Sequence, residues 1–582
     1  MKTIYGIDLG TTNSCISWLN QGIPEVISIQ DSPLVPSVVS FEQQEVIVGQ
    51  RAVNRAVLHP ELTVSSVKRV MGMDQSFDIQ GSIYTPEDIS SYILSYLKSQ
   101  AEEIQGQEVK DVVITVPAYF SDAQRRATQK AGQLAGLNVE RIINEPTSAA
   151  LFYTQVLSSQ VIDNTEKHVL VYDLGGGTFD VSVLRMGELT EVLASTGNTR
   201  LGGDDFDQAL MERCLEEIMS THGLDLRSYR PALARLRPAA EQAKIELSSQ
   251  PFAIIEETLI PNPENKQLDL QLEISRPDFT EMIEPYLQTT REEMHRALSE
   301  SGLQAREIDH VLLVGGSTRI PAVVSLLEEE FGSSRMPIVD PDLCVAKGAA
   351  IQGGIITGSH IHQVLVDVTS HTLSTGALVS PYDPRLECVP IISRNTQIPI
   401  TRSEVFYTVA PNQEMIRATV YQGESREPEE NTLIGTLDLS LAPSPGGSPI
   451  VIEYSYDLNG IIRVKVEQKG YSRKREVDLD SSKQNQQFLE LDMHGDWDDL
   501  DQDLEEDEQE LQDNREQDKQ VTNYILHKAR GILDTCQDQG QKNTLKSLIQ
   551  AYETALREED EDAVDEAEEV LVDYLDELEG KA

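Results

Sequence analysis

Apolar and polar positions alternate over residues 1–358 in two ways, one typical of buried strands and one typical of amphipathic helices. Residues 112–117 are an apolar run ended by proline, which predicts a buried strand, and Asp122 is the expected N-cap of the helix that follows. Helical spacing returns over 239–247, 277–301 and 321–330. This succession of strands and helices predicts an α/β fold for 1–358.

The pattern changes near residue 359. A short apolar segment comes first, and we expect residues 359–368 to be an interdomain linker. The next residues are rich in β-branched side chains, prolines and turn signals, with a predicted hairpin turn at 457–460 (DLNG). These features predict an antiparallel β-sandwich domain over 369–479.

The C-terminal part of the chain differs again. Residues 480–518 are acidic and poorly patterned, which predicts a flexible insert. Over 519–582 apolar residues recur at helical spacing, which predicts three amphipathic helices with breaks near Gly540 and Glu559.

A hairpin with the same kind of tip occurs twice in 1–358. Residues 7–12 (IDLGTT) and 172–178 (YDLGGGT) each end an apolar run with an acid, followed by glycine and threonine. Glycine lets backbone N–H groups converge on phosphate oxygens, threonine adds donors, and an acid can hold a hydrated divalent cation. One Asp-x-Gly turn is more often ordinary turn chemistry. Two copies at matching strand ends instead predict two lobes that grip one triphosphate across a cleft.

A third glycine-containing element follows another apolar run. Residues 311–321 (VLLVGGSTRIP) predict a buried strand that opens through a glycine pair into a helix. Because backbone at such a pair can approach a flat ring closely, we expect it to form the nucleoside end of the same site.

The formal net charge is -49, and the acids are concentrated near the C-terminus. Residues 490–518 hold fifteen acids and one base, Arg515. A surplus of this size would repel polyanions, so nucleic acid and an anionic membrane are excluded as expected partners.

The five cysteines are scattered, with no C-x-x-C pair, which argues against a disulfide framework and against a zinc site. No apolar run approaches the roughly 20 residues of a membrane span. Asp8 interrupts the first apolar run too early for a secretory signal. The expected compartment is the cytoplasm.

The glycine-containing segments resemble those of the heat-shock-protein-70 (DnaK-type) chaperones. The matching segments are 6–14 (GIDLGTTNS), 113–128 (VITVPAYFSDAQRRAT), 141–150 (RIINEPTSAA), 171–181 (VYDLGGGTFDV), 201–207 (LGGDDFD), 243–249 (AKIELSS) and 314–321 (VGGSTRIP). The resemblance implies a two-lobed, actin-like ATPase with duplicated ribonuclease H-like lobes over 1–358. It also implies a substrate-binding β-sandwich and a helical, lid-like domain over 519–582.

The resemblance implies catalytic roles for a set of charged residues. Asp8 and Asp173 would hold the waters around Mg²⁺, and K⁺ is a further possible ion. Lys68 would reach the terminal phosphate and the attacking water. Glu145 would orient that water, with Thr178 and Asp180 close by. For each of these residues the alternative is a surface charge or a strand cap.

The resemblance also assigns residues that bind ATP and ADP. The phosphates would be held by Gly10, Thr11, Thr12, Asn13, Gly175, Gly176, Gly177, Gly202 and Gly203. The base and ribose would be held by Glu241, Lys244, Ser248, Gly315, Gly316, Ser317, Arg319 and Asp342. The spacing of Glu241, Lys244 and Ser248 places them on one helical face.

In the family, nucleotide hydrolysis changes how an apolar linker docks, and thereby the affinity for unfolded peptide. The corresponding linker residues are Val364, Leu365, Val366 and Asp367. Arg141, Asn144 and Asp367 match positions linked to J-domain cochaperones. After Thr369 the chain departs from the family, because 370–372 (SHT) replaces a proline-centred turn.

The peptide cleft of the family is recognisable but altered. Phe406, Ile416 and Ala418 match apolar cleft positions, and Leu378 and Val409 match the arch over the bound chain. An insertion around 381–384 lengthens the neighbouring loop. The alternative is that these five side chains simply pack the β core.

Together these features predict an ATP-dependent chaperone that binds exposed apolar segments of unfolded polypeptides and couples ATP hydrolysis to their capture and release. The expected partners are unfolded or partly folded polypeptides, a J-domain cochaperone and a nucleotide exchange factor. The alternative is a nucleotide-gated accessory protein or exchange-factor relative that scaffolds another chaperone. A small-molecule kinase is disfavoured, because it has no use for the linker and β domain.

Overall fold

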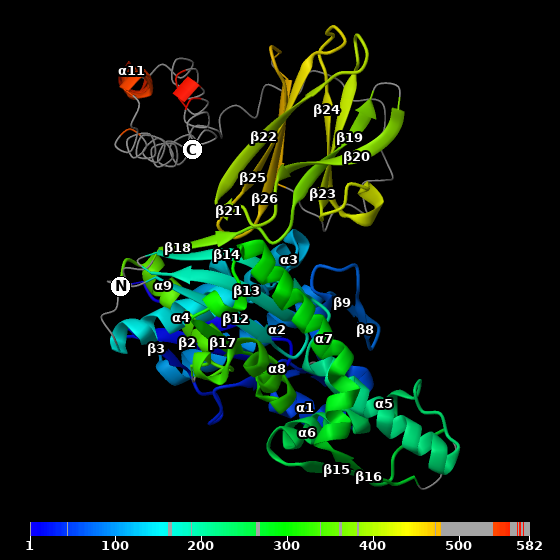
Figure 1. Cartoon of the computed structure of the whole chain (residues 1–582). Coiled ribbons are helices and arrows are strands. Elements are labelled where there is room, and N and C mark those ends of the chain that lie inside the picture. The colour runs from blue at the N-terminus through cyan, green and yellow to red at the C-terminus, as the bar shows by residue number, and fades with distance from the viewer. Residues whose placement is uncertain are drawn as a thin grey trace. The chain divides into compact units, whose positions relative to one another are not determined.

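The computed structural model describes residues 2–42, 45–160, 166–187, 189–263, 268–337, 339–359, 364–380, 383–471, 473–478 and 539–558, together with 533, 567, 570, 571 and 574. The chain divides into two compact units, 1–488 and 489–582. Figure 1 shows that sheets covered by helices make up the first part of the larger unit, and that strands make up most of its last part.

The first lobe is built on a sheet with strand order β11-β10-β1-β2-β3, with β4 paired to β2. Its strands are β1 (Ile4–Asp8), β2 (Asn13–Asn20), β3 (Ile23–Val26), β4 (Val35–Pro36), β10 (Asp111–Val116) and β11 (Asn138–Asn144). Strands β1 and β10 are parallel, so Asp8 lies opposite Thr115 at their carboxyl ends. Both strands are buried because α2 (Pro86–Gln105), α3 (Asp122–Leu134) and α9 (Cys344–Ile356) cover the sheet.

Smaller elements complete the first lobe. They are β5 (Val39–Glu42), β6 (Glu45–Val48), α1 (Gln50–Ala56), β7 (Thr63–Val64), the 3-10 turn η2 (Val67–Val70), β8 (Phe77–Ile79) and β9 (Ser82–Tyr84).

The second lobe repeats the arrangement of a hairpin beside a parallel strand. Its strand order is β17-β12-β13-β14-β18-β21, in which β12 is antiparallel to β13 and parallel to β17. The strands are β12 (Lys167–Leu174), β13 (Phe179–Met186), β14 (Leu189–Asn198), β17 (His310–Val314), β18 (Val364–Val368) and β21 (Gln397–Ile398). The predicted pair of hairpins is therefore confirmed.

The second lobe also contains helices and one further hairpin. They are α4 (Glu145–Gln160), α5 (Gly203–His222), α6 (Arg230–Ser249), α7 (Arg276–Ser301), α8 (Pro321–Phe331) and the hairpin of β15 (Phe252–Glu257) and β16 (Leu270–Ser275). This hairpin packs on α5, α6 and α7. Buried side chains of the strands, including Tyr172, Phe179 and Val181, pack with those of α5, α6 and α7 in one core.

Helix α9 contacts both lobes, because it packs on β1 and β2 and also on α4. The approach to β1 is so close that a Cβ at Gly6 would lie 2.3 Å from the backbone nitrogen of Ala350. Only glycine fits there, which explains why glycine interrupts an otherwise apolar strand.

The β domain consists of two four-stranded antiparallel sheets, in the orders β20-β19-β23-β24 and β22-β25-β26-β27. The strands are β19 (Leu373–Ser380), β20 (Asp383–Ile392), β22 (Ile400–Tyr407), β23 (Met415–Gln422), β24 (Thr432–Ser440), β25 (Pro449–Tyr456), β26 (Ile462–Gln468) and β27 (Arg473–Asp478). Alternate residues of β25 and β26 are buried, so the core lies between the sheets. The predicted turn at 457–460 connects these two strands.

Residues Val364–Val368 of the predicted linker form strand β18, and residues 360–363 lie outside the described part of the chain. Strand β18 pairs in parallel with β14 of the second lobe, with Leu189 opposite Val364. On its other side it pairs with β21, with Asp367 opposite Ile398. The second-lobe sheet therefore continues through the linker strand to β21 of the β domain.

Two local predictions were wrong. Ser121, not Asp122, is the N-cap of α3, because its hydroxyl accepts from Gln124 and the Gln124 side chain returns a hydrogen bond to the Ser121 N–H. Asp122 is fully buried instead. Helix α6 begins at Arg230, ahead of the predicted start at 239, because Pro238 is accommodated inside the helix.

In the smaller unit, one helix, α11 (Gln539–Glu558), is described in full. It begins beside Gly540 and ends beside Glu559, where breaks were expected. Leu545, Ile549 and Tyr552 pack with Leu571 in a small core, which agrees with the apolar spacing of the tail. The predicted acidic insert, 480–518, lies outside the described residues. Within the described part of the chain, no helix has the length and apolar character of a membrane span.

Candidate active site

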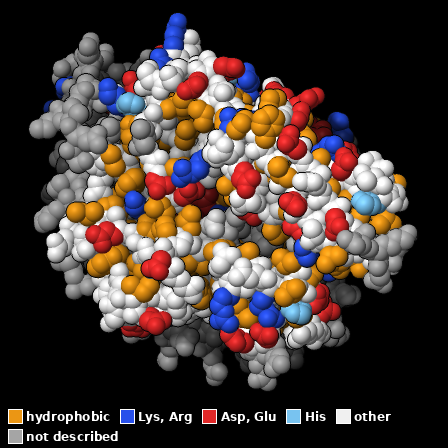
Figure 2. Space-filling view, turned by 90° about the horizontal axis from the view of Figure 1, so that it is seen from below, with side chains coloured by type: hydrophobic (Ala, Val, Ile, Leu, Met, Phe, Trp, Pro, Cys, Tyr) orange, Lys and Arg blue, Asp and Glu red, His pale blue; other side chains and the backbone are white. Residues whose placement is uncertain are grey.

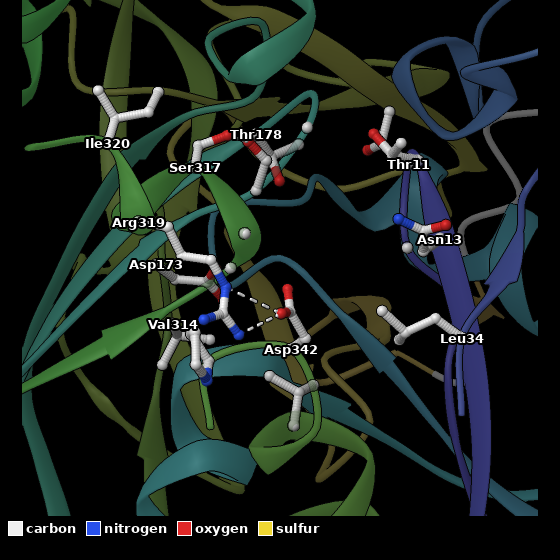
Figure 3. Close-up of a pocket in the computed structure, with 18 of the residues that line it drawn as sticks. Thr11, Asn13, Leu34, Asp173, Thr178, Val314, Ser317, Arg319, Ile320 and Asp342 are labelled. Atoms are coloured by element: carbon white, nitrogen blue, oxygen red, sulfur yellow. Dashed lines mark hydrogen bonds and ion pairs between the residues drawn. The ribbon is translucent and has the colours of Figure 1, made fainter. Parts of the chain in front are cut away.

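The tips of the two repeated hairpins line one cavity of about 620 Å³. This volume is within the range of small-ligand sites. The first lobe contributes Asp8, Gly10, Thr11, Thr12, Asn13, Leu34 and Lys68, and the second contributes Glu145, Asp173, Gly175, Gly176 and Thr178. Figure 3 shows Thr11 and Asn13 across the cavity from Asp173, Thr178 and Ser317. Seen from below in Figure 2, the molecule is hollowed near its centre, with side chains of both charges around the hollow.

The two hairpin tips approach each other so closely that side chains are excluded. A Cβ on Gly176 would lie 1.9 Å from Oγ1 of Thr12, and one on Gly177 would lie 2.6 Å from Thr11. A Cβ on Gly10 would lie 2.0 Å from the backbone oxygen of Asn13. The glycines therefore leave backbone and threonine hydroxyls as the groups at this end of the cavity, as a phosphate cradle requires.

Helix α5 is attached to the second hairpin tip through its own glycines. The Gly203 N–H donates to the carbonyl of Gly175 at 2.9 Å, and the Asp204 N–H donates to that of Gly176 at 2.7 Å. Gly202, Gly203 and Gly177 are not among the described residues that line the cavity. These three glycines therefore lie behind the cavity-lining part of the second hairpin tip, where they fix its shape.

Charged residues form a buried cluster at the floor of the cavity. The Lys68 ammonium donates to Oε1 of Glu145, and both side chains are almost fully buried. Thr115 donates to Oδ1 of Asp8 at 3.1 Å, and the Tyr119 N–H donates to Oδ1 of Asp180 at 3.0 Å. Asp180 does not line the cavity itself, but it lies behind Asp173 on the paired strand.

Burial and mutual repulsion shift the pKa values of these carboxyls. Burial, with the nearby Glu145 carboxylate, raises the pKa of Asp8 to about 7 and that of Asp180 to about 7. The same causes raise the pKa of Asp173 well above its usual value. Burial alone would lower the pKa of Lys68, but Glu145 and Asp8 outweigh it and the pKa is raised. One lysine among four acids leaves an excess of negative charge that a divalent cation would offset.

The acids also fit a cation that is held indirectly. Oδ2 of Asp173 is buried and has no hydrogen-bond partner. Within the described residues, no group of three or more His, Cys, Asp or Glu side chains is arranged to hold a metal ion. A partnerless carboxylate oxygen in a cluster of acids suits Mg²⁺, which keeps several waters and uses few carboxylates together with phosphate oxygens.

The other end of the cavity is formed by α6 and the turn after β17. The Arg319 guanidinium donates to Oδ2 of Asp342 from Nη2 at 2.7 Å and from Nε at 3.2 Å, as Figure 3 shows. Gly315 adopts a φ of 81°, and a Cβ there would lie 2.4 Å from the Leu174 carbonyl oxygen. All eight residues assigned to the base and ribose line the cavity: Glu241, Lys244, Ser248, Gly315, Gly316, Ser317, Arg319 and Asp342.

A comparison with protein families bears on this geometry. The chain matches the family model described as Hsp70 protein over residues 4–80 and 73–581. The chain belongs to the Hsp70 family. Hsp70 proteins are ATPases with actin-like lobes and a β-sandwich, and they act generally as chaperones. The duplicated lobes and the pair of antiparallel sheets agree with that architecture.

The linker strand of this Hsp70 protein contacts residues that precede and follow Glu145. Asp367 is half-buried, and its Oδ2 accepts from Asn144 at 2.9 Å and from Thr147 at 3.1 Å. Burial raises the pKa of Asp367 and lowers the pKa of the neighbouring Arg141. Leu365 packs on a small core with Ile143 and Leu151. The structure therefore brings together Arg141, Asn144, Leu365 and Asp367, with Val364 and Val366 in the same strand.

The five residues assigned to the peptide cleft are divided between core and surface. Ala418 is 1% exposed and belongs to the β core, and Phe406 and Ile416 pack partly against it. Leu378 and Val409 are 43% and 54% exposed. Ala418 thus follows the packing alternative, whereas the two arch residues have free surface for a ligand.

Sequence reasoning gave no role to several residues at the site. Leu34 lines the cavity from a loop, and Thr115 and Tyr119 hold two of the acids. Asp207 binds Lys244. The parallel register of β1 and β10 brings Thr115 next to Asp8. This contact could not be predicted, because pairing between strands that are distant in the chain leaves no local pattern in the sequence.

Proposed function

We propose that this Hsp70 protein is an ATP-dependent chaperone that captures and releases exposed apolar segments of unfolded polypeptides. The proposal rests chiefly on one observation: two glycine-rich hairpin tips and the buried Lys68–Glu145 pair surround a single cavity. The linker strand lies against the segment that carries Glu145.

The cavity suits a nucleoside triphosphate at both ends. The hairpin tips offer backbone N–H groups, the Thr11 and Thr12 hydroxyls and the Asn13 amide, which are donors for phosphate oxygens. Gly315 and Gly316 leave room beside the chain for a flat base. Asp342 and Arg319 lie at the same end and can bind the nucleoside.

Asp8 and Asp173 would hold Mg²⁺ through water. The bound ion would neutralise charge that develops on the phosphate oxygens during hydrolysis. The partnerless oxygen of Asp173 and the raised pKa of Asp8 support this assignment, since both carboxyls lack a compensating cation of their own.

Hydrolysis requires a water positioned in line with the γ-phosphorus. Water forms the new P–O bond as the bond to the β–γ bridging oxygen breaks, giving ADP and phosphate. Glu145 would orient the water, and Lys68 would stabilise the negative charge of the transition state. Thr178 and Asp180, at the base of the second hairpin, would complete the arrangement.

The linker offers a physical route from hydrolysis to the β domain. Asn144 binds Asp367 of the linker, also accepts a hydrogen bond from Arg125 at 2.7 Å, and precedes Glu145 in the chain. A change in the position of Glu145 would therefore be transmitted through Asn144 to the linker strand. The strand can pair with the lobe edge in one nucleotide state and release in the other.

The exposed Leu378 and Val409 support a peptide site in the β domain, where burial of apolar side chains would supply affinity of low sequence specificity. A J-domain cochaperone near Arg141, Asn144 and Asp367, a nucleotide exchange factor and a cytoplasmic location complete the proposal.

The full chain tests this function directly. ATP turnover is measured with and without a fluorescent, unfolded peptide, and the release of that peptide is followed after ATP is added. The proposal requires that the peptide accelerates turnover and that ATP accelerates peptide release. ATP binding without either response would reject the chaperone and favour the scaffold.

A further inference from the structure

One buried acid beside the cavity has no role in the proposed reaction. Asp207 lies on α5 and is 6% exposed. Its Oδ2 accepts a hydrogen bond from Nζ of Lys244 at 2.8 Å, whereas its Oδ1 is buried without a partner. A buried carboxylate with only half of its hydrogen-bonding capacity used costs stability, so its retention calls for an explanation.

Lys244 connects three separate parts of the second lobe. It lies on α6 and lines the cavity. Its Nζ donates to the Gly203 carbonyl at 3.1 Å as well as to Asp207. Gly203 in turn donates to the Gly175 carbonyl at the tip of the second hairpin, and Ser317 donates to that same carbonyl at 2.9 Å. The Lys244 ammonium thus ties α6 to the phosphate cradle.

Asp207 fixes where this ammonium lies. A lysine side chain has four flexible carbon–carbon torsions, and ordering it at the moment of binding would cost affinity. The pair with Asp207 orders it before the ligand arrives. An ammonium has three N–H donors, of which Gly203 and Asp207 take two, so one is left for a ligand in the cavity.

We propose that Asp207 is a positioning residue that holds the Lys244 ammonium against the cavity, so that its remaining donor binds the nucleotide and slows nucleotide release. The inference rests on the proposed function, because it assumes that the cavity binds nucleotide. Beyond the proposed function, it states that Asp207 sets how long the nucleotide stays bound.

The surroundings of Asp207 supply a specific readout. The charged groups that face it are Lys244 and Glu241 on α6 and Asp204 on its own helix. Burial outweighs the effect of Lys244 and raises the pKa of Asp207 to about 6. Below that pH the carboxyl becomes neutral and its hold on Lys244 weakens. Protonation of Asp207 between pH 7 and pH 5 should therefore accelerate nucleotide release.

The release of a fluorescent ADP analogue from the full chain, followed by stopped flow, tests the inference. Asp207→Asn should release ADP about tenfold faster than the wild type at pH 7.5, a change of about 1.4 kcal/mol. Glu217→Gln is the matched control, because Glu217 is on the same helix and pairs with Arg213 near the surface. The control should release ADP at the wild-type rate.

Two further measurements separate positioning from general damage. The ratio of the ADP release rate of Asp207→Asn to that of the wild type should fall towards one at pH 5. Titration of other carboxyls changes the release rate of both proteins and therefore cancels in this ratio. Adding Asp207→Asn to Lys244→Met should accelerate release no further than Lys244→Met alone. A ratio that is independent of pH, additive effects, or unchanged release in Asp207→Asn would overturn the inference. Failure of the wild type to bind ADP would instead reject the proposed function.

Discussion

The imidazole ring of His371 packs against the phenol ring of Tyr119, with 4.2 Å between the ring centroids. His371 lies just before β19 of the β domain, and the backbone N–H of Tyr119 donates to the carboxylate of Asp180. The adjacent Ser370 donates to the carbonyl of Ala118. The contact between the β domain and the first lobe therefore lies directly beside an acid of the proposed catalytic site.

This contact predicts a pH dependence of linker docking. Burial, together with Arg394 and Arg125, lowers the pKa of His371 to about 3. When the contact is released, the pKa of the imidazole returns to its ordinary value of about 6.5. As the pH falls, His371 is therefore protonated in the released state at a higher pH than in the docked state. Docking is fully favoured above pH 6.5 and weakens as the pH falls towards 3. At pH 5.5 the loss should be about 1.4 kcal/mol.

Amide hydrogen exchange of residues 364–368, corrected for the intrinsic effect of pH, measures this loss. Exchange should increase about tenfold more between pH 7.5 and 5.5 in the wild type than in His371→Leu. His222→Gln, at an exposed histidine of α5, is the control and should follow the wild type. Equal pH dependence in wild type and His371→Leu would show that another group titrates.

Lys68→Ala should lower ATP turnover by about two to three orders of magnitude, because it removes a positive charge beside the proposed reacting phosphate. Nucleotide binding should be largely retained, since the backbone of both hairpin tips is untouched. Turnover and ADP affinity are measured on the same preparation. Lys130→Ala, at a half-exposed lysine of α3 that pairs with Glu87, serves as the control. Normal turnover in Lys68→Ala would refute the catalytic role.

Asp173→Asn should weaken the dependence of ADP affinity on Mg²⁺, because Asp8 remains as the other carboxyl assigned to the ion. In the wild type, chelation of the metal should weaken ADP binding, because the partnerless oxygen of Asp173 then repels the phosphates. The amide carries no charge, so the loss of ADP affinity on chelation should be smaller in the variant than in the wild type. Calorimetric titrations in each condition give the comparison. If chelation did not change the ADP affinity of the wild type, the assignment of Asp173 to Mg²⁺ would be contradicted.

The β domain allows core and ligand-contact roles to be separated. Leu378→Ala and Val409→Ala should weaken peptide binding with little change in unfolding free energy, because both side chains are exposed. Ala418→Leu should instead destabilise the β domain by about 1–3 kcal/mol, since the site is fully packed. Peptide titration and chemical denaturation measure the two effects. If the peptide affinity were unchanged in both Leu378→Ala and Val409→Ala, these two exposed side chains would have no role in peptide binding.

The sequence was most informative where function depends on local backbone. The conformational freedom of glycine is a property of the residue itself, so the sequence predicted the two glycine-containing hairpin tips and the Gly315–Gly316 turn. Helix boundaries were less secure. Ser121 and Asp122 are both good caps, and only the reciprocal bond with Gln124 distinguishes them.

The sequence by itself indicated the duplicated hairpins with Asp8 and Asp173 at their strand ends, because turn chemistry and hydrophobic period are local properties. The roles of Lys68 and Glu145 were predicted only from the resemblance to the family. Tertiary structure alone decided that Thr115 meets Asp8, that His371 meets Tyr119 and that Asp207 holds Lys244. Those contacts depend on strand register and helix packing between distant segments, which the spacing of residues along one segment does not encode.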